Sequence, residues 1–200
     1  MRLRFLIVFV LAAGAVARAG GPSTQPAPDP AEVFRTFLMD IETGKKAAVP
    51  AVCRAQDPDA QSLVRDFQAV ATSMQELREA ATIKFGPDAA EAILPSLPTA
   101  GDMEDINQTI TGDHAQIEGP DVWPVQMVRV GGQWKLDVDW LVRSDNVAPN
   151  AHWFGAMAVA MHKTAADINS GRLGTADAAT EAMAVREQAI PDTATTQPGP

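Results

Sequence analysis

The sequence predicts an α+β domain in which N-terminal helices pack on a curved, cone-like antiparallel sheet and a C-terminal helical hairpin follows. Three observations predict this class. Helical periodicity dominates residues 29–94, two β-hairpin patterns fill residues 104–142, and helical periodicity returns over residues 151–189. Because strands and helices are grouped along the chain instead of alternating, we expect one domain over residues 29–190 with its helices and sheet in separate layers.

The first helices begin at Asp-Pro pairs, which supply a capping carboxylate and a proline at the first helical position. These pairs are Asp29-Pro30 and Asp57-Pro58. The second pair predicts a long amphipathic helix ending at Phe85, and residues 45–53 predict a short helix between the two. The long helix carries one broad apolar stripe: Leu63, Phe67, Val70, Met74, Leu77, Ala81 and Phe85.

A glycine pair, Gly131-Gly132, predicts a β-hairpin over residues 123–142, because a two-residue turn requires positive φ. The facing pairs are then Val130/Gln133, Arg129/Trp134, Val128/Lys135, Met127/Leu136, Gln126/Asp137, Val125/Val138, Pro124/Asp139 and Trp123/Trp140. Alternation predicts an apolar face of Trp123, Val125, Met127, Leu136, Val138 and Trp140. The opposite, solvated face would carry Gln126, Lys135, Asp137 and Asp139.

A second turn, Gly112-Asp113, predicts another hairpin earlier in the chain. Its facing pairs are Thr111/His114, Ile110/Ala115, Thr109/Gln116, Gln108/Ile117 and Asn107/Glu118. The buried face would hold Ile106, Ile110, Ala115 and Ile117. His114 falls on the other face, so we expect it to point to solvent.

The ends of the chain carry export and tail signals. Residues 1–19 combine a basic start, an apolar run and the small-x-small tripeptide at residues 17–19, which is typical of a cleaved signal peptide. The mature protein is therefore expected to begin at Gly20 and to be secreted or periplasmic, with an uncleaved membrane anchor as the alternative. Residues 20–28 predict a flexible linker, and residues 191–200 a disordered tail.

Charge and cysteine content exclude several classes of function. The formal net charge is −9, and removal of residues 1–19 leaves 13 basic and 25 acidic residues, a net charge of −12. Such an acidic protein disfavours nucleic acids and anionic membranes as partners. Cys53 is the only cysteine, so no intramolecular disulfide can form. We expect it to be a small buried side chain, and the alternatives are a reactive thiol or an intermolecular disulfide.

Two segments give the chain a resemblance to a known family. They read Gly112-Asp113-His114-Ala115 and Gly132-Gln133-Trp134-Lys135-Leu136-Asp137. Following the N-terminal helices, they resemble the nuclear transport factor 2-like (SnoaL-like) superfamily, exported bacterial type, over residues 31–142. The resemblance implies a cone-shaped domain whose sheet wraps around a long helix. Its enzymes place a histidine or aspartate in the mouth of the cone, and residues 151–189 lie outside the common domain.

The sequence predicts no catalytic residue, metal ligand set or cofactor. It contains no nucleophile elbow, phosphate loop or Cys-x-x-Cys motif, and the histidines at 114, 152 and 162 lack metal-ligand spacing. The candidate ligand site is instead an aromatic pocket formed by Trp123, Trp140, Trp153 and Phe154. The alternative is that these rings cap the core.

Three functions remain open at this point. The favoured one is a non-catalytic exported domain that binds a small apolar ligand or a protein partner. The second is an isomerase- or dehydratase-like enzyme with His114 or a distant acid such as Asp40, Glu42 or Asp102 in the cone. The third is a structural module whose C-terminal helices form a homodimer.

Overall fold

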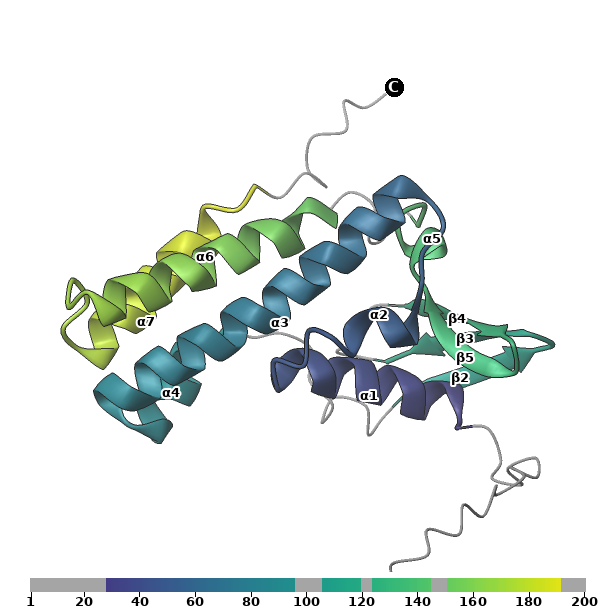
Figure 1. Cartoon of the computed structure of the whole chain (residues 1–200), viewed down its shortest axis with the longest axis horizontal. Coiled ribbons are helices and arrows are strands. Elements are labelled where there is room, and N and C mark those ends of the chain that lie inside the picture. Colours follow the sequence, from purple (N-terminus) through teal and green to yellow (C-terminus); the bar gives the residue numbers. More distant parts are fainter. Residues whose placement is uncertain (1–27, 96–105, 120–123, 145–150, 192–200) are drawn as a thin grey trace, which may run out of the picture.

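The computed structural model describes residues 28–95, 106–119, 124–144 and 151–191. In these residues the chain forms seven helices and one five-stranded sheet, so the predicted α+β class is confirmed. The sheet lies at one end of the molecule, and the long helices extend away from it (Figure 1). The signal segment, residues 20–27 of the linker, Trp123 and residues 192–200 of the tail lie outside the described residues.

The N-terminal helices start at the two Asp-Pro pairs, as predicted. In α1 (Pro30–Glu42) the Asp29 side chain accepts a hydrogen bond from Ala31 N, and in α3 (Pro58–Phe85) Asp57 accepts one from Asp59 N. The short helices α2 (Val49–Val52) and α4 (Pro87–Ile93) flank α3 in the sequence. Six of the seven residues of the predicted α3 stripe are buried, and Phe85 at its end is half-buried. This stripe therefore forms the centre of the core.

The sheet has the strand order β1-β5-β4-β3-β2. Its members are β1 (Cys53–Arg54), β2 (Asn107–Thr111), β3 (His114–Glu118), β4 (Val125–Val130) and β5 (Gln133–Asp137). The short strand β1 pairs with β5 in parallel, with Cys53 opposite Leu136. The prediction of a purely antiparallel sheet is therefore wrong at this edge. A strand of two residues is too short to show alternation. Cys53 was therefore included in the short helix predicted for residues 45–53, and β1 was missed.

The hairpin of β2 and β3 has the predicted register in all five pairs, from Thr111/His114 to Asn107/Glu118. The hairpin of β4 and β5 follows the prediction from Val130/Gln133 to Met127/Leu136 only. The predicted pairs Gln126/Asp137, Val125/Val138 and Pro124/Asp139 are wrong, because β5 ends at Asp137 and the chain turns into α5 (Val138–Leu141). The pair Trp123/Trp140 includes a residue outside the described residues.

The buried face of the sheet is formed by Ala115, Ile117, Val125, Met127, Trp134 and Leu136. Helix α1 packs against β5. Ile110 was expected on this face but remains 49% exposed, because β2 is the outer strand of the sheet. Asp137 and Asp139, expected in solvent, are 6% and 5% exposed. For Ile110, Asp137 and Asp139, the predicted burial or exposure depended only on the alternation of side chains along a strand.

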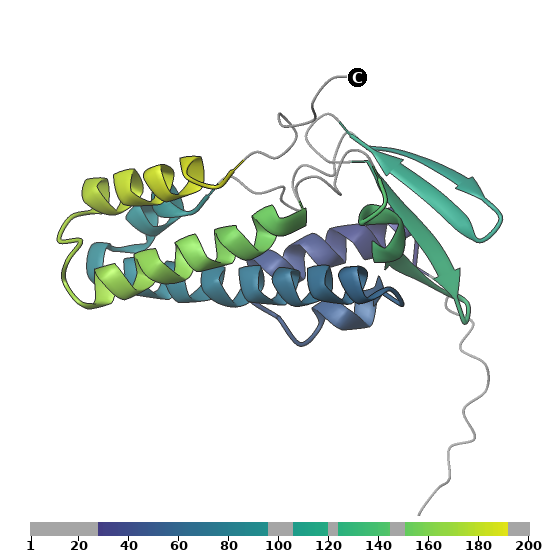
Figure 2. The same ribbon diagram turned by 90° about the horizontal axis from the view of Figure 1, so that it is seen from above.

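The C-terminal helices are α6 (Ala151–Asn169) and α7 (Ala176–Gln188). Helix α6 lies alongside α3, and α7 packs on α6 and α4, as the second view shows (Figure 2). Arg186 of α7 joins the two last helices, since its guanidinium donates to Thr164 Oγ1 and to the Asp167 carboxylate. None of the helices in the described ranges combines the length and apolar character needed to cross a membrane.

Candidate functional site

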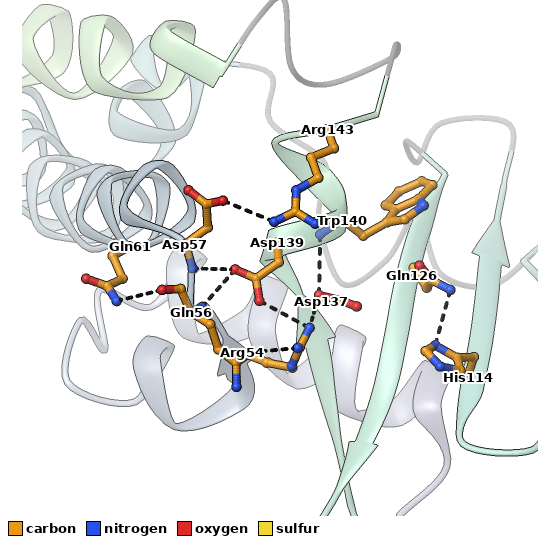
Figure 3. Close-up of polar contacts among 10 residues, drawn as sticks. All are labelled: Arg54, Gln56, Asp57, Gln61, His114, Gln126, Asp137, Asp139, Trp140 and Arg143. Atoms are coloured by element: carbon orange, nitrogen blue, oxygen red, sulfur yellow. Dashed lines mark hydrogen bonds and ion pairs between the residues drawn. The ribbon is translucent and has the colours of Figure 1, made fainter.

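Three charged side chains meet where β1, β5, α5 and the start of α3 converge (Figure 3). We call Arg54, Asp137 and Asp139 the buried charge cluster. Both aspartates are almost fully buried, and Arg54 is partly buried between them. Because isolated buried charges are costly, such a group must satisfy its own hydrogen bonds to persist in a fold.

The local sequence brings both aspartates inward. Asp137 has left the strand conformation, with φ −81° and ψ 86°, and its side chain caps α5 by accepting from Trp140 N at 3.3 Å. Because α5 starts there, Asp139 no longer shares the solvated face of the strand with Lys135. Its side chain points toward the start of α3. An aspartate three residues before the amide that it caps is an ordinary helix-start signal. This signal was present in the sequence and was outweighed by the alternation of the strand.

Arg54 holds the two carboxylates together. Its Nη1 lies 2.9 Å from Asp137 Oδ1 and 3.1 Å from Asp139 Oδ2, and its Nη2 donates to Gln56 Oε1 at 2.9 Å. Arg54 comes from β1, more than 80 residues before its partners at the end of β5 and in α5. The ion pair therefore closes a long loop and fixes the orientation of β1 on the sheet.

Asp139 also fixes the start of α3. Its Oδ1 accepts from the backbone N–H groups of Gln56 and Asp57, each at 2.8 Å. Its Oδ2 is buried and makes no hydrogen bond of good geometry with the described residues, so only the charge of Arg54 at 3.1 Å stabilises it. Negative charge is favourable at the amino end of a helix, which adds to the stabilisation.

An outer ion pair borders the cluster. Arg143 Nη2 donates to Asp57 Oδ2 at 3.0 Å. The backbone N–H of Asp59, and secondly Arg143, hold the pKa of Asp57 below its ordinary value. Together with the buried charge cluster, the pair makes a group of three carboxylates and two guanidinium groups, with a formal charge of −1.

The arrangement joins segments and offers little chemistry. A general base needs a lone pair free to meet the proton that it abstracts. Asp139 Oδ1 already accepts two amide donors, and Asp137 Oδ1 accepts from Arg54 and Trp140 N. Asp139 Oδ2 keeps its lone pairs, but it is buried against Arg54, away from solvent. The cluster is therefore a structural link between the sheet and α3.

The other acid–base candidates do not converge on it. His114 is exposed, as predicted, and its Nδ1 lies 3.3 Å from Gln126 Nε2 on the open face of the sheet. Asp40 is buried on α1, with its carboxylate 3.6 Å from Lys45 Nζ. Glu42 is half-buried, and Asp102 lies outside the described residues.

Cys53 lies on β1 beside Arg54, and the residue is half-buried. Burial of its thiol raises the pKa to about 12, against a smaller opposing effect of Lys135. The thiolate is the nucleophile in cysteine chemistry, and at neutral pH this group is almost wholly protonated. The geometry thus agrees with a packing role for Cys53.

Of the predicted pocket residues that the structure describes, Trp153 and Phe154 are in ring contact. Phe154 is buried and makes edge-to-face contacts with Trp153 at 5.4 Å and with Phe67 at 4.9 Å. This row of rings continues into α1 through Phe37. Trp140 is half-buried on α5 and takes no part in these ring contacts among the described residues.

One acidic residue near this row was missed in the sequence. Asp66 is half-buried on α3 against Gly155 of α6, where an added Cβ would lie 3.1 Å from Asp66 Oδ1. Burial raises the pKa of Asp66 above its ordinary value, and Arg65 opposes the effect. The glycine within the pattern of α6 was the one available signal, since such a residue often marks a close approach.

Within the described ranges, no group of three or more histidine, cysteine, aspartate or glutamate side chains is arranged to hold a metal ion. Comparisons with protein-family models, with curated proteins and with solved structures found no match.

Proposed function

We propose that this chain is an exported, non-catalytic binding domain that takes a small apolar ligand or a protein partner. The observation that carries the proposal is the state of its buried reactive groups. Asp137 and Asp139 are held by Arg54 and backbone amides, and burial raises the pKa of Cys53 to about 12. The side chains best placed for chemistry are thus committed to the fold.

Two half-buried tryptophans supply the binding surface in this proposal. Trp140 lies on α5 and Trp153 in the first turn of α6, where it packs edge-on against Phe154. Tryptophan combines a large apolar area with little conformational entropy, so partly exposed indoles are effective anchors for apolar ligands and protein partners.

The fold family and the export of the chain are also proposals. A fold of the nuclear transport factor 2-like type is supported by the two segments at residues 112–115 and 132–137 and by the packing of α1 on β5, whereas the long helix α3 packs chiefly on α6. Export with a mature start at Gly20 is supported by the signal-peptide pattern of residues 1–19.

One observation favours the second function, an isomerase- or dehydratase-like enzyme. Asp66 is half-buried next to the row of rings, and burial raises the pKa of its carboxyl group. General acids are often tuned in this way by an apolar environment. Asp66 thus replaces His114 as the residue on which an enzymatic role would depend.

Binding of the neutral apolar dye N-phenyl-1-naphthylamine to the exported chain tests the proposal. We expect a saturable rise in dye fluorescence, weakened about tenfold by Trp153→Ala or Trp140→Ala, since loss of one aromatic contact is worth about 1.4 kcal/mol. Trp134→Phe is the matched control, because Trp134 is buried under Arg129 in the sheet. Equal binding by all variants would contradict the proposed surface.

The enzymatic alternative has a separate readout. Small molecules that copurify with the exported chain can be incubated with fresh protein and analysed by mass spectrometry. We expect them to be recovered unchanged. A mass change with the unsubstituted chain that disappears with Asp66→Asn would establish the enzyme instead.

A further inference from the structure

We propose that the outer edge of β2 is a docking site for an extended polypeptide segment of a partner protein that carries Lys or Arg at its ends. β2 is the last strand of the sheet among the described residues, and all five of its residues are exposed. It lies at the opposite edge of the sheet from β1 and the buried charge cluster. The proposal extends the protein-partner part of the proposed function to a surface of its own.

The register shows which main-chain groups face outward. Arg129 N donates to Asp113 O, so Asp113 and Ala115 direct their backbone groups toward β4. His114, Gln116 and Glu118 then direct theirs toward β2.

The residues opposite these three on β2 are Thr111, Thr109 and Asn107, and their backbone groups point inward to β3. Gln108 and Ile110 lie between them, so their N–H and C=O groups point away from the sheet. Four main-chain groups are thus presented in the spacing that an added strand requires.

The strand itself lacks the residue types that usually protect a sheet edge. Its sequence is Asn-Gln-Thr-Ile-Thr, with no lysine and no proline. Natural edges are commonly blocked by such residues, by bulges or by a covering segment. Ile110, 49% exposed, is an apolar contact for the incoming chain.

The charges around β2 indicate which kind of partner segment would bind there. The hairpin from Asn107 to Glu118 contains two acids, Asp113 and Glu118, and no lysine or arginine. A third acid, Asp29, lies on the inner face of β2, where it accepts a hydrogen bond from Gln108 Nε2. The strand is therefore uncharged in its middle, and its surroundings carry a net negative charge even with Arg129 of β4 3.9 Å from Asp113. This suits a partner segment with an uncharged middle and basic ends. A second copy would bring the same acids face to face.

Fluorescence anisotropy with a labelled peptide, Lys-Thr-Val-Thr-Val-Thr-Lys, tests the proposal. Ile110→Pro removes one outward N–H and no hydrogen bond to β3, whereas Ile110→Thr keeps the N–H. We expect saturable binding to the unsubstituted chain and to Ile110→Thr, and binding at least about tenfold weaker to Ile110→Pro. Circular dichroism checks that both variants fold.

Changes in the peptide test the same contacts without altering the protein. The peptide with glutamate at both ends, and the lysine peptide with N-methylated valines, should each bind at least about tenfold more weakly. Trp153→Ala should bind the lysine peptide as the unsubstituted chain does, which separates this site from the proposed aromatic surface.

Three outcomes would overturn the proposal. They are absence of lysine-peptide binding, equal binding by Ile110→Pro, and equal binding of the glutamate peptide. Dimerisation that is abolished by Ile110→Pro in sedimentation experiments would show that a second copy occupies the edge instead. None of these outcomes changes the result of the dye experiment, so the two proposals fail separately.

Discussion

The two β-hairpins differ in how far local sequence controls them. In the hairpin of β2 and β3, the turn at Gly112 sets five pairs, and all five residues of β2 are exposed. In the hairpin of β4 and β5, the turn sets four pairs, and then the chain leaves the sheet at Asp137. In the first hairpin the pairing continues through Asn107 and Glu118, close to the limit of the described residues, whereas the second hairpin ends in the buried charge cluster.

This difference shows what decides the end of a strand. Alternation would allow β5 to continue through Val138 and Trp140, but Asp137 caps α5 and Asp139 fixes the start of α3. Several hydrogen bonds to charged groups, each worth about 1.5–3 kcal/mol, outweigh a few additional strand pairs. Tertiary bonding by carboxylates therefore overrides the β-propensity of the residues between them.

The largest effect should come from neutralising Asp139. Asp139→Asn removes one of the two carboxylates that flank Arg54 and places amide N–H donors against that guanidinium or against the backbone N–H groups of Gln56 and Asp57. We expect the free energy of unfolding to fall by about 3 kcal/mol, since hydrogen bonds to a buried charged group are lost or weakened. Denaturant unfolding followed by circular dichroism measures this.

Glu118→Gln is the matched control for this change in the other hairpin. Glu118 is exposed, so its substitution should alter stability by less than about 0.5 kcal/mol. The sequence pattern alone would assign Asp139 the same small effect, because it places that residue in solvent. Equal midpoints for the two variants would show that the buried charge cluster contributes nothing.

Much of the fold could be predicted from local signals. The Asp-Pro starts of α1 and α3, the glycine turns and the stripe of α3 each depend on residues close in the sequence. The contacts that join these elements could not be predicted from local signals. Arg54 meets Asp137 across 83 residues, and no periodicity specifies such a partner.

The residues of the candidate site also divide into those placed by local sequence signals and those placed by packing between distant segments. The exposure of His114 came from hairpin register, which is local, and was correct. The position of Asp66 against Gly155 depends on how α3 packs on α6, so only the presence of a glycine indicated it. A pocket at the four predicted aromatic residues stays a prediction, since Trp123 lies outside the described residues.

A second, smaller effect should come from the turns. Gly131 and Gly132 both have positive φ, 59° and 81°, whereas in the other turn only Gly112 does, at 61°. A Cβ at these positions meets no neighbouring atom within 4 Å, so alanine costs only backbone conformational energy, about 1–2 kcal/mol per residue.

Replacing both Gly131 and Gly132 by alanine should therefore lower the free energy of unfolding about twice as much as Gly112→Ala, measured by denaturant unfolding. Asn at position 132 is the control, because asparagine tolerates left-handed conformations better than alanine. If Gly112→Ala were the more costly change, the turn of the first hairpin would be the more strained of the two.

The smallest effect should be electrostatic and dependent on pH. The pKa of Asp57 is lowered in the folded chain, first by the backbone N–H of Asp59 and then by Arg143. A lowered carboxyl pKa stabilises the fold above the unfolded-state value, near 3.8, and this contribution is lost as the pH falls through the folded-state value. Asp57→Asn keeps the capping oxygen and removes the charge.

Thermal midpoints of Asp57→Asn and the unsubstituted chain should therefore differ slightly between pH 5 and pH 7, with the variant lower, and converge below the ordinary carboxyl pKa of about 3.8. Added salt should narrow the gap at pH 7, because the Arg143 pair is exposed. Asp113→Asn in the first hairpin is the control, since its carboxylate lies 3.9 Å from Arg129 and is largely exposed. A gap that stays constant as the pH falls to 3 would mean that Asp57 acts through its geometry, so that the border of the buried charge cluster would be as insensitive to charge as the exposed hairpin.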